Sequence, residues 1–132
     1  MIVADGIIYS LQRHGGITVY FNELIKRMSK CLDGGYQLLI YDSAFNLDHS
    51  PLQYEVRSIR PFERYRRCKV PVNASLFHSS YYRLPDRNIP VITTVHDFTY
   101  ERFISGPRNW LHSWHKFAAI RASKAIICIS EN

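Results

Sequence analysis

Five consecutive β-branched residues, Val91–Val95, form the stretch that most constrains the fold. The run has no helical periodicity, and such a run is typical of a strand that is buried on both faces of a parallel sheet. It ends at once in His96 and Asp97. Open α/β sheets bind ligands beyond the carboxyl ends of their strands, so this pair is a candidate for a functional site. The alternative is that His96 caps the strand and Asp97 opens a turn.

The remaining sequence alternates strand-like runs with helical patterns. A helix is predicted from Ile17 to Leu32, because apolar residues recur there at helical spacing and Gly34-Gly35 follows. A second helix is predicted from about Arg108 to Ser123. The predicted strands are Met1–Tyr9, Tyr36–Tyr41, Tyr54–Ile59, Ala74–His78, Val91–Val95 and Lys124–Ile129. This alternation favours an α/β fold with a Rossmann-like parallel sheet and flanking helices, and a hydrophobic content of 46% excludes a disordered chain.

A net charge of +6 makes nucleic acid, anionic lipid and phosphorylated ligands candidate partners. The basic residues are densest between Arg57 and Lys69, where Phe62 and Tyr65 lie among them. This pattern is either a solvated face or an interfacial segment on an anionic membrane. The sequence carries no recognisable RNA- or DNA-binding motif, so we expect no nucleic acid partner.

Three widely spaced cysteines without a CxxC pair indicate neither a zinc site nor a disulfide framework, and they favour a reducing cytosol. The His96-Asp97 pair is also similar to the metal-binding pair of phosphohydrolases, but no second ligand pair accompanies it at a suitable spacing. We therefore predict no metal. The sequence shows no secretion signal and no apolar run near the ~18 residues of a membrane span. We expect a cytoplasmic protein whose membrane contact would be peripheral, on the inner face.

Gly15 and Gly16 stand directly before the first predicted helix. Backbone N–H groups and the helix dipole make such a position suitable for an anion, although a Gly-Gly pair is often only a turn. The dinucleotide fingerprint is absent, because Ile17 and Thr18 stand where it needs a glycine. Asp42 alone would imitate its acidic residue, so no nicotinamide cofactor is predicted.

Four segments, in this order along the chain, resemble family 4 glycosyltransferases. Gly15–Leu24 is similar to the first loop and helix of that family, and Leu76–Pro85 to the segment after its fourth strand. Val91–Phe103 is similar to its His-Asp strand end, and Ala122–Glu131 to the strand that closes with Ser-Glu. The likeness covers nearly the whole chain apart from about residues 43 to 74.

The resemblance implies a retaining glycosyltransferase of the two-domain GT-B fold, of which this chain is part of the N-terminal, acceptor-side domain. The donor is then a nucleotide-sugar and the acceptor a glycan or a lipid-linked saccharide, and no metal or other cofactor is expected. The C-terminal domain of that family holds most of the nucleotide. Because the likeness stops at Asn132, we expect the 132-residue chain to be inactive by itself.

The resemblance also implies roles for the motifs, and His96 contacts the donor sugar. Asp97, the second predicted catalytic residue, orients His96 or caps the next turn and does not act as a base. The remaining donor contacts are Gly15 and Gly16 with the diphosphate, and Ser130 and Glu131 with the nucleotide-sugar.

The acceptor residues are predicted from their position after a strand. The expected lining of the acceptor groove is His78, Tyr81, Tyr82 and Arg83, with packing on the His96 loop as the alternative for the two tyrosines. Two other functions stay open at this point. The chain could form a non-catalytic Rossmann-like binding module, or part of a sugar-nucleotide epimerase with the GT-B fold.

Overall fold

The computed structural model describes residues 1–13, 15–32, 35–44, 53–96 and 107–129. Its centre is a six-stranded sheet with the strand order β3-β2-β1-β4-β5-β6, and every neighbouring pair is parallel. The strands are β1 (Ile2–Asp5), β2 (Tyr36–Tyr41), β3 (Gln53–Arg57), β4 (Leu76–Ser79), β5 (Val91–Val95) and β6 (Ala125–Cys128). The predicted Rossmann-like α/β fold is confirmed.

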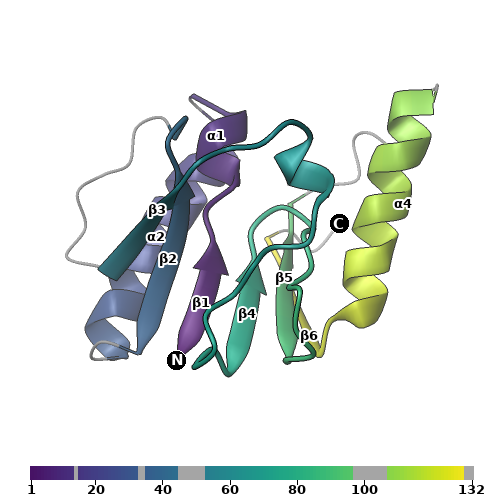
Figure 1. Ribbon diagram of the computed structural model, residues 1–132. Helices are drawn as coiled ribbons and strands as arrows, with labels where there is room; N and C mark the ends of the chain where they lie inside the picture. The colour runs from purple at the N-terminus through teal and green to yellow at the C-terminus, as the bar shows by residue number, and fades with distance from the viewer. Residues whose placement is uncertain (14, 33–34, 45–52, 97–106, 130–132) are drawn as a thin grey trace.

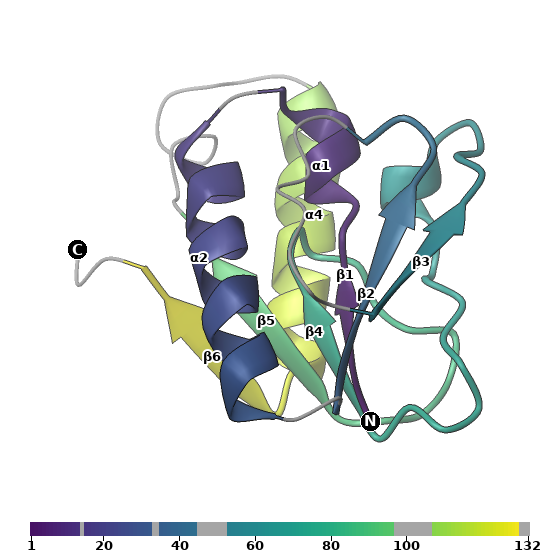
Figure 2. The ribbon, with the colours of Figure 1, turned by 90° about the vertical axis from the view of Figure 1, so that its left-hand side faces the viewer.

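Helices cover the two faces of the sheet. After β1 the chain forms the short helix α1 (Ile8–Leu11) and then α2 (Gly16–Cys31), which lies against one face. Helix α4 (Pro107–Ala122) lies on the opposite face, as the two views in Figures 1 and 2 show. The segment between β3 and β4, which contains the 3-10 turn η1 (Glu63–Tyr65), also lies on the face away from α2.

Three apolar clusters of the described residues hold these layers together, and the smallest, made of Tyr82, Val95 and Ala119, joins α4 to the sheet. The cluster under α2 includes Ile8, Tyr9, Phe21, Ile25, Leu38 and Ile40. The cluster on the other face includes Val3, Leu39, Cys68, Val70, Phe77 and Val91. Leu38 and Leu39 enter different clusters because successive side chains of a strand point to opposite faces. Each large apolar side chain that is buried in this way contributes about 1.5–3 kcal/mol to stability.

The first strand is shorter than predicted, because it ends at Asp5 and not at Tyr9. Ile8 and Tyr9 belong to α1 and pack under α2, so they are buried as expected but in a helix. The other predicted elements lie within a few residues of the observed ones. β2 and β5 have the predicted bounds.

Gly6 explains why the chain leaves the sheet at this point. Its N–H donates to the carbonyl of Leu39 at 2.7 Å. A Cβ at this position would lie 2.5 Å from the same carbonyl oxygen, which is closer than real Cβ contacts allow. The absence of a side chain therefore lets the end of β1 pass directly beside β2 before it turns into α1.

Candidate functional site

His96 lies at the carboxyl edge of the sheet, directly after β5. Its ring is 6% exposed, and Nε2 lies 3.2 Å from the carbonyl oxygen of Ser80. Because a carbonyl only accepts hydrogen bonds, Nε2 carries the proton of this contact. Ser80 directly follows β4, so two neighbouring strand ends meet at this histidine.

The N-terminal half of α2 packs against His96. The His96 ring centroid lies 6.0 Å from that of Tyr20 and 5.7 Å from that of Phe21, both with edge-to-face geometry. Tyr20 lies one turn after Gly16, the first residue of α2. The structure thus brings the start of α2 and His96 to the same edge of the sheet.

Gly15 and Gly16 lie at the N-terminus of α2. Gly15 has extended backbone angles, and its carbonyl accepts the hydroxyl of Thr18 at 3.0 Å. No side chain caps the N-terminus of α2. A Cβ on Gly16 would meet no atom within 4 Å, so Gly16 faces open space. Packing in the described part of the chain gives no reason for a glycine at position 16.

His78 lies in the interior and not in an open groove. It is the third residue of β4 and 5% exposed. Its Nε2 lies 2.9 Å from the hydroxyl of Thr94, and its Nδ1 lies 3.3 Å from that of Tyr36. Because both ring nitrogens have partners inside the protein, His78 serves the core of this edge, and its position argues against the expected contact with an acceptor.

The burial of His78 predicts a loss of stability on acidification. Burial and the neighbouring His96 lower the pKa of His78 to about 4. An unfolded histidine titrates near 6.5, so below that pH the unfolded chain binds a proton that the folded chain does not. We expect the free energy of unfolding to fall between pH 6.5 and pH 4, by up to roughly 3 kcal/mol from this residue.

Urea unfolding across this pH range measures the effect, and His78→Gln is the matched variant because glutamine does not titrate. Its pH profile should be flatter than that of the wild type. Some slope should remain, since burial and Arg64 also lower the pKa of His115 to about 4. Parallel profiles for the wild type and the variant would contradict the prediction.

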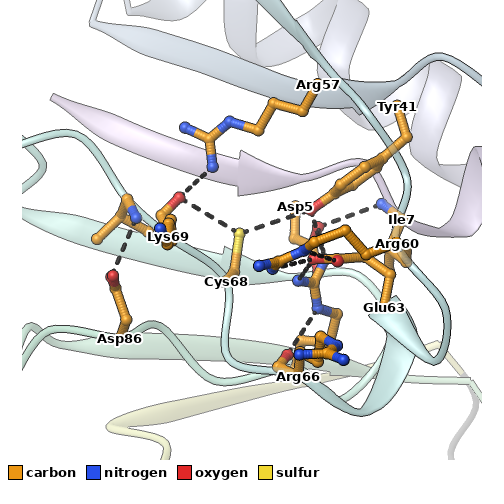
Figure 3. A network of polar contacts seen from close by, with 12 residues as sticks. Asp5, Ile7, Tyr41, Arg57, Arg60, Glu63, Arg66, Cys68, Lys69 and Asp86 are labelled. Carbon is orange, nitrogen blue, oxygen red and sulfur yellow. Dashed lines mark hydrogen bonds and ion pairs between the residues drawn. The ribbon is translucent and has the colours of Figure 1, made fainter.

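Arg83 is also interior, where it joins a buried ion network with Asp5, Tyr41 and Glu63, three of the residues that Figure 3 labels. Its Nη1 donates to Asp5 Oδ1 at 3.1 Å and to the hydroxyl of Tyr41 at 2.6 Å. Its Nη2 donates to Glu63 Oε1 at 2.7 Å, and its Nε to the carbonyl of Arg66 at 3.0 Å. The guanidinium therefore joins the ends of β1 and β2 to η1. This position argues against the expected contact with an acceptor.

The pKa values of the two acids in this network, Asp5 and Glu63, shift in opposite directions. Burial raises the pKa of Asp5, although Arg83 and the Ile7 N–H act against that rise. Burial also acts to raise the pKa of Glu63, but the hydrogen bond from Arg60 and the charge of Arg83 hold it below its usual value. The pKa of Cys68 beside them is raised to about 12 by burial, so this thiol stays protonated at neutral pH.

The two tyrosines of the predicted acceptor group differ in exposure. Tyr82 is buried and has a left-handed backbone, with φ of 61°. Tyr81 is half-buried, and its hydroxyl lies 3.3 Å from His112 Nε2 and 3.4 Å from Arg64 Nη2. Both rings thus pack between the carboxyl edge and α4, and Tyr81 keeps part of its surface open.

Three predicted site residues, Asp97, Ser130 and Glu131, lie outside the described residues. In the described part, no group of three or more His, Cys, Asp or Glu side chains is arranged to hold a metal ion. The residues that sequence reasoning missed are Asp5 and Glu63. An aspartate that ends an apolar run was a signal for Asp5, whereas Glu63 looked like an ordinary acid in a basic segment.

The basic segment from Arg57 to Lys69 is largely tied to the protein itself. Arg60 Nε donates to Glu63 Oε2 at 2.8 Å, and Arg67 Nη1 donates to the carbonyl of Pro85 at 3.0 Å. The Arg64 guanidinium lies 5.1 Å from the centroid of the Tyr81 ring. No helix among the described residues has the length and apolar character needed to cross a membrane. A peripheral membrane contact stays a prediction.

The fold and this edge define a Rossmann-like α/β protein with a histidine and a glycine-led helix at the carboxyl ends of its strands. Comparison of the chain with protein-family models, with curated proteins and with solved structures finds no match. The function must therefore be inferred from the residues at this edge.

Proposed function

We propose that this chain is part of the acceptor-side domain of a retaining glycosyltransferase, which moves a sugar from a nucleotide-sugar to a glycan or a lipid-linked acceptor. One observation carries the proposal. His96 at the end of β5 lies against the first turns of α2, whose first residue, Gly16, faces open space. Open α/β sheets bind their ligands at this edge.

His96 acts on the donor sugar. The Ser80 carbonyl holds the ring at Nε2, so the contact with a sugar hydroxyl falls to Nδ1. Nδ1 is buried in this structure, so the donor must open the edge around the ring to reach it. This contact orients the sugar and places a polar ring where positive charge develops at the anomeric carbon. The rings of Tyr20 and Phe21 restrict the imidazole to this orientation.

The start of α2 receives the diphosphate of the donor. The first N–H groups of the helix point out of its N-terminus, and the helix dipole favours an anion there. The open space over Gly16 lets a phosphate approach the backbone. Tyr81 is the predicted acceptor residue that keeps exposed surface in this arrangement, so we assign the acceptor to its side of the edge.

We expect Gly16→Ala to weaken nucleotide-sugar binding by about tenfold or more without loss of stability. The added methyl group meets no atom of the described residues within 4 Å but stands where the diphosphate is proposed to approach. Alanine is also the better helix former, by up to about 1 kcal/mol. Isothermal titration calorimetry on the natural full-length protein measures the affinity for a panel of nucleotide-sugars, and thermal unfolding measures stability.

Glu23→Ala is the matched control, because Glu23 is an exposed residue of the same helix nearly two turns further on. It should leave the donor affinity unchanged. If the wild-type protein binds no nucleotide-sugar of the panel, the proposed function is wrong. If it binds one and Gly16→Ala binds it equally well, the diphosphate does not lie at the start of α2.

A further inference from the structure

A cavity lined by polar side chains lies at the carboxyl ends of β2 and β3, on the other side of β1 from His96. Its volume is about 290 Å³, close to the lower end of the ~300–1,000 Å³ range of small-molecule sites. Tyr41 and Arg57, the last residues of the two strands, are register partners and both line it. Arg60 and Lys69 add two further cationic side chains from the segment that follows.

The arginine side chains are held in place by the protein. Arg57 Nε donates to Glu55 Oε1 at 2.8 Å, and its Nη1 donates to the main-chain carbonyl of Lys69. Arg60 donates from Nε and Nη2 to the two oxygens of Glu63, at 2.8 Å and 3.3 Å. Figure 3 shows Arg57 reaching over to Lys69 and Arg60 lying beside Glu63. Each guanidinium is therefore fixed by contacts that use only part of its five N–H donors.

The charges around the cavity are unequal. Three cationic side chains line it, against the two carboxylates of Glu55 and Glu63. Both carboxylates already accept hydrogen bonds from arginines, and Glu63 also accepts one from the buried Arg83. The ammonium group of Lys69 pairs with no acidic side chain in the described part of the chain. The cavity thus retains positive charge and spare N–H donors.

We propose that this cavity binds the phosphate group of a small phosphate monoester, such as a phosphorylated sugar or polyol. Fixed guanidinium groups match phosphate oxygens in geometry, and an ammonium group adds a third donor and charge. The exposed Ser58 provides a hydroxyl that can contact the rest of the ligand. This inference does not depend on the proposed glycosyltransferase function, because none of these residues takes part in the contacts of His96 or the start of α2.

Isothermal titration calorimetry on the natural full-length protein tests the proposal with three probes at low ionic strength: inorganic phosphate, glucose 6-phosphate and glucose. Both phosphates should bind and glucose should not. Tighter binding of glucose 6-phosphate would identify a sugar phosphate as the ligand, and equal binding would identify the phosphate group alone. Binding of neither phosphate at tens of millimolar would overturn the proposal.

Lys69→Ala is the decisive variant. It removes an exposed ammonium group and leaves the Lys69 carbonyl that holds Arg57, so folding should not suffer. Loss of one charge-assisted hydrogen bond should weaken phosphate binding about tenfold. Lys30→Ala removes the same charge from the exposed face of α2 and should leave binding unchanged. Equal weakening by the two variants would show a general charge effect and no site in the cavity.

Gly16→Ala separates this site from the one at the start of α2. Phosphate that binds in the cavity should be unaffected by Gly16→Ala and weakened by Lys69→Ala. The reverse pattern would place the phosphate at the start of α2 and refute the cavity proposal. Nucleotide-sugar binding has no bearing on this comparison, so the two proposals can fail separately.

Discussion

Replacing Arg83 with methionine should lower the free energy of unfolding by about 3–5 kcal/mol, which is a large share of the roughly 5–15 kcal/mol that stabilises a folded protein. The substitution removes the guanidinium that serves Asp5, Glu63 and Tyr41 at once. The Asp5 and Glu63 carboxylates would stay buried, with Asp5 left without its cationic partner. A buried carboxylate in that situation must either take up a proton or draw water into the core.

Urea unfolding at neutral pH measures this effect, with Arg27→Met as the matched control. Arg27 lies on the exposed face of α2 and forms a surface ion pair with Glu23, so its replacement should change stability by less than about 1 kcal/mol. Adding Asp5→Asn and Glu63→Gln to Arg83→Met should recover part of the loss, because the charge that then stays unpaired, on Arg60, is half-exposed and not buried. If Arg83→Met alone is as stable as Arg27→Met, the network does not stabilise the fold.

The second large effect concerns turnover. Under the proposed glycosyltransferase function, His96→Gln should lower the rate of sugar transfer about 10²–10³-fold, the size of the effect of removing one oxyanion-hole donor in other enzymes. Glutamine has the length to keep the hydrogen bond to the Ser80 carbonyl, but it offers no acceptor at the position of Nδ1. Asparagine can place its amide near Nδ1, so His96→Asn should retain more activity than His96→Gln.

Product formation from the nucleotide-sugar, followed by chromatography, gives the rates, and thermal unfolding reports on the packing against Tyr20 and Phe21. A structural role for His96 would make activity follow stability in the two variants. The proposed contact with the sugar instead makes His96→Asn more active than His96→Gln, whatever their relative stability. Near-normal turnover in His96→Gln would remove His96 from the mechanism.

The sequence was most informative where one local pattern decides the structure. The β-branched run Val91–Val95 and the strand Tyr36–Tyr41 have the predicted bounds, because short apolar runs between turn residues suit buried parallel strands. The same reasoning extended the first strand to Tyr9. A short apolar run does not distinguish a buried strand from a buried helix, and here Ile8 and Tyr9 belong to the helix α1.

The candidate site likewise contains one residue that local sequence predicts, His96, and one that it does not, Arg83. The position of His96 at a strand end follows from its neighbours in sequence. The position of Arg83 depends on Asp5, 78 residues away, and on Glu63 in a turn that has no clear local signal. An arginine after a strand end looks like an exposed binding residue, since this residue type is rarely buried without a partner. Only the assembled fold reveals that partner.

The place of β1 inside the sheet has a consequence for the order in which the protein can assemble during its synthesis. β1 is made first, yet its pairing with β4 joins Ile2 to Leu76, and its buried Asp5 meets its cation only at Arg83. Until that stretch leaves the ribosome, one edge of β1 stays unpaired and one carboxylate has no counter-charge. Contacts this distant in sequence form slowly, and an open strand edge is prone to aggregate. The nascent chain therefore passes through a long interval in which its first strand needs protection.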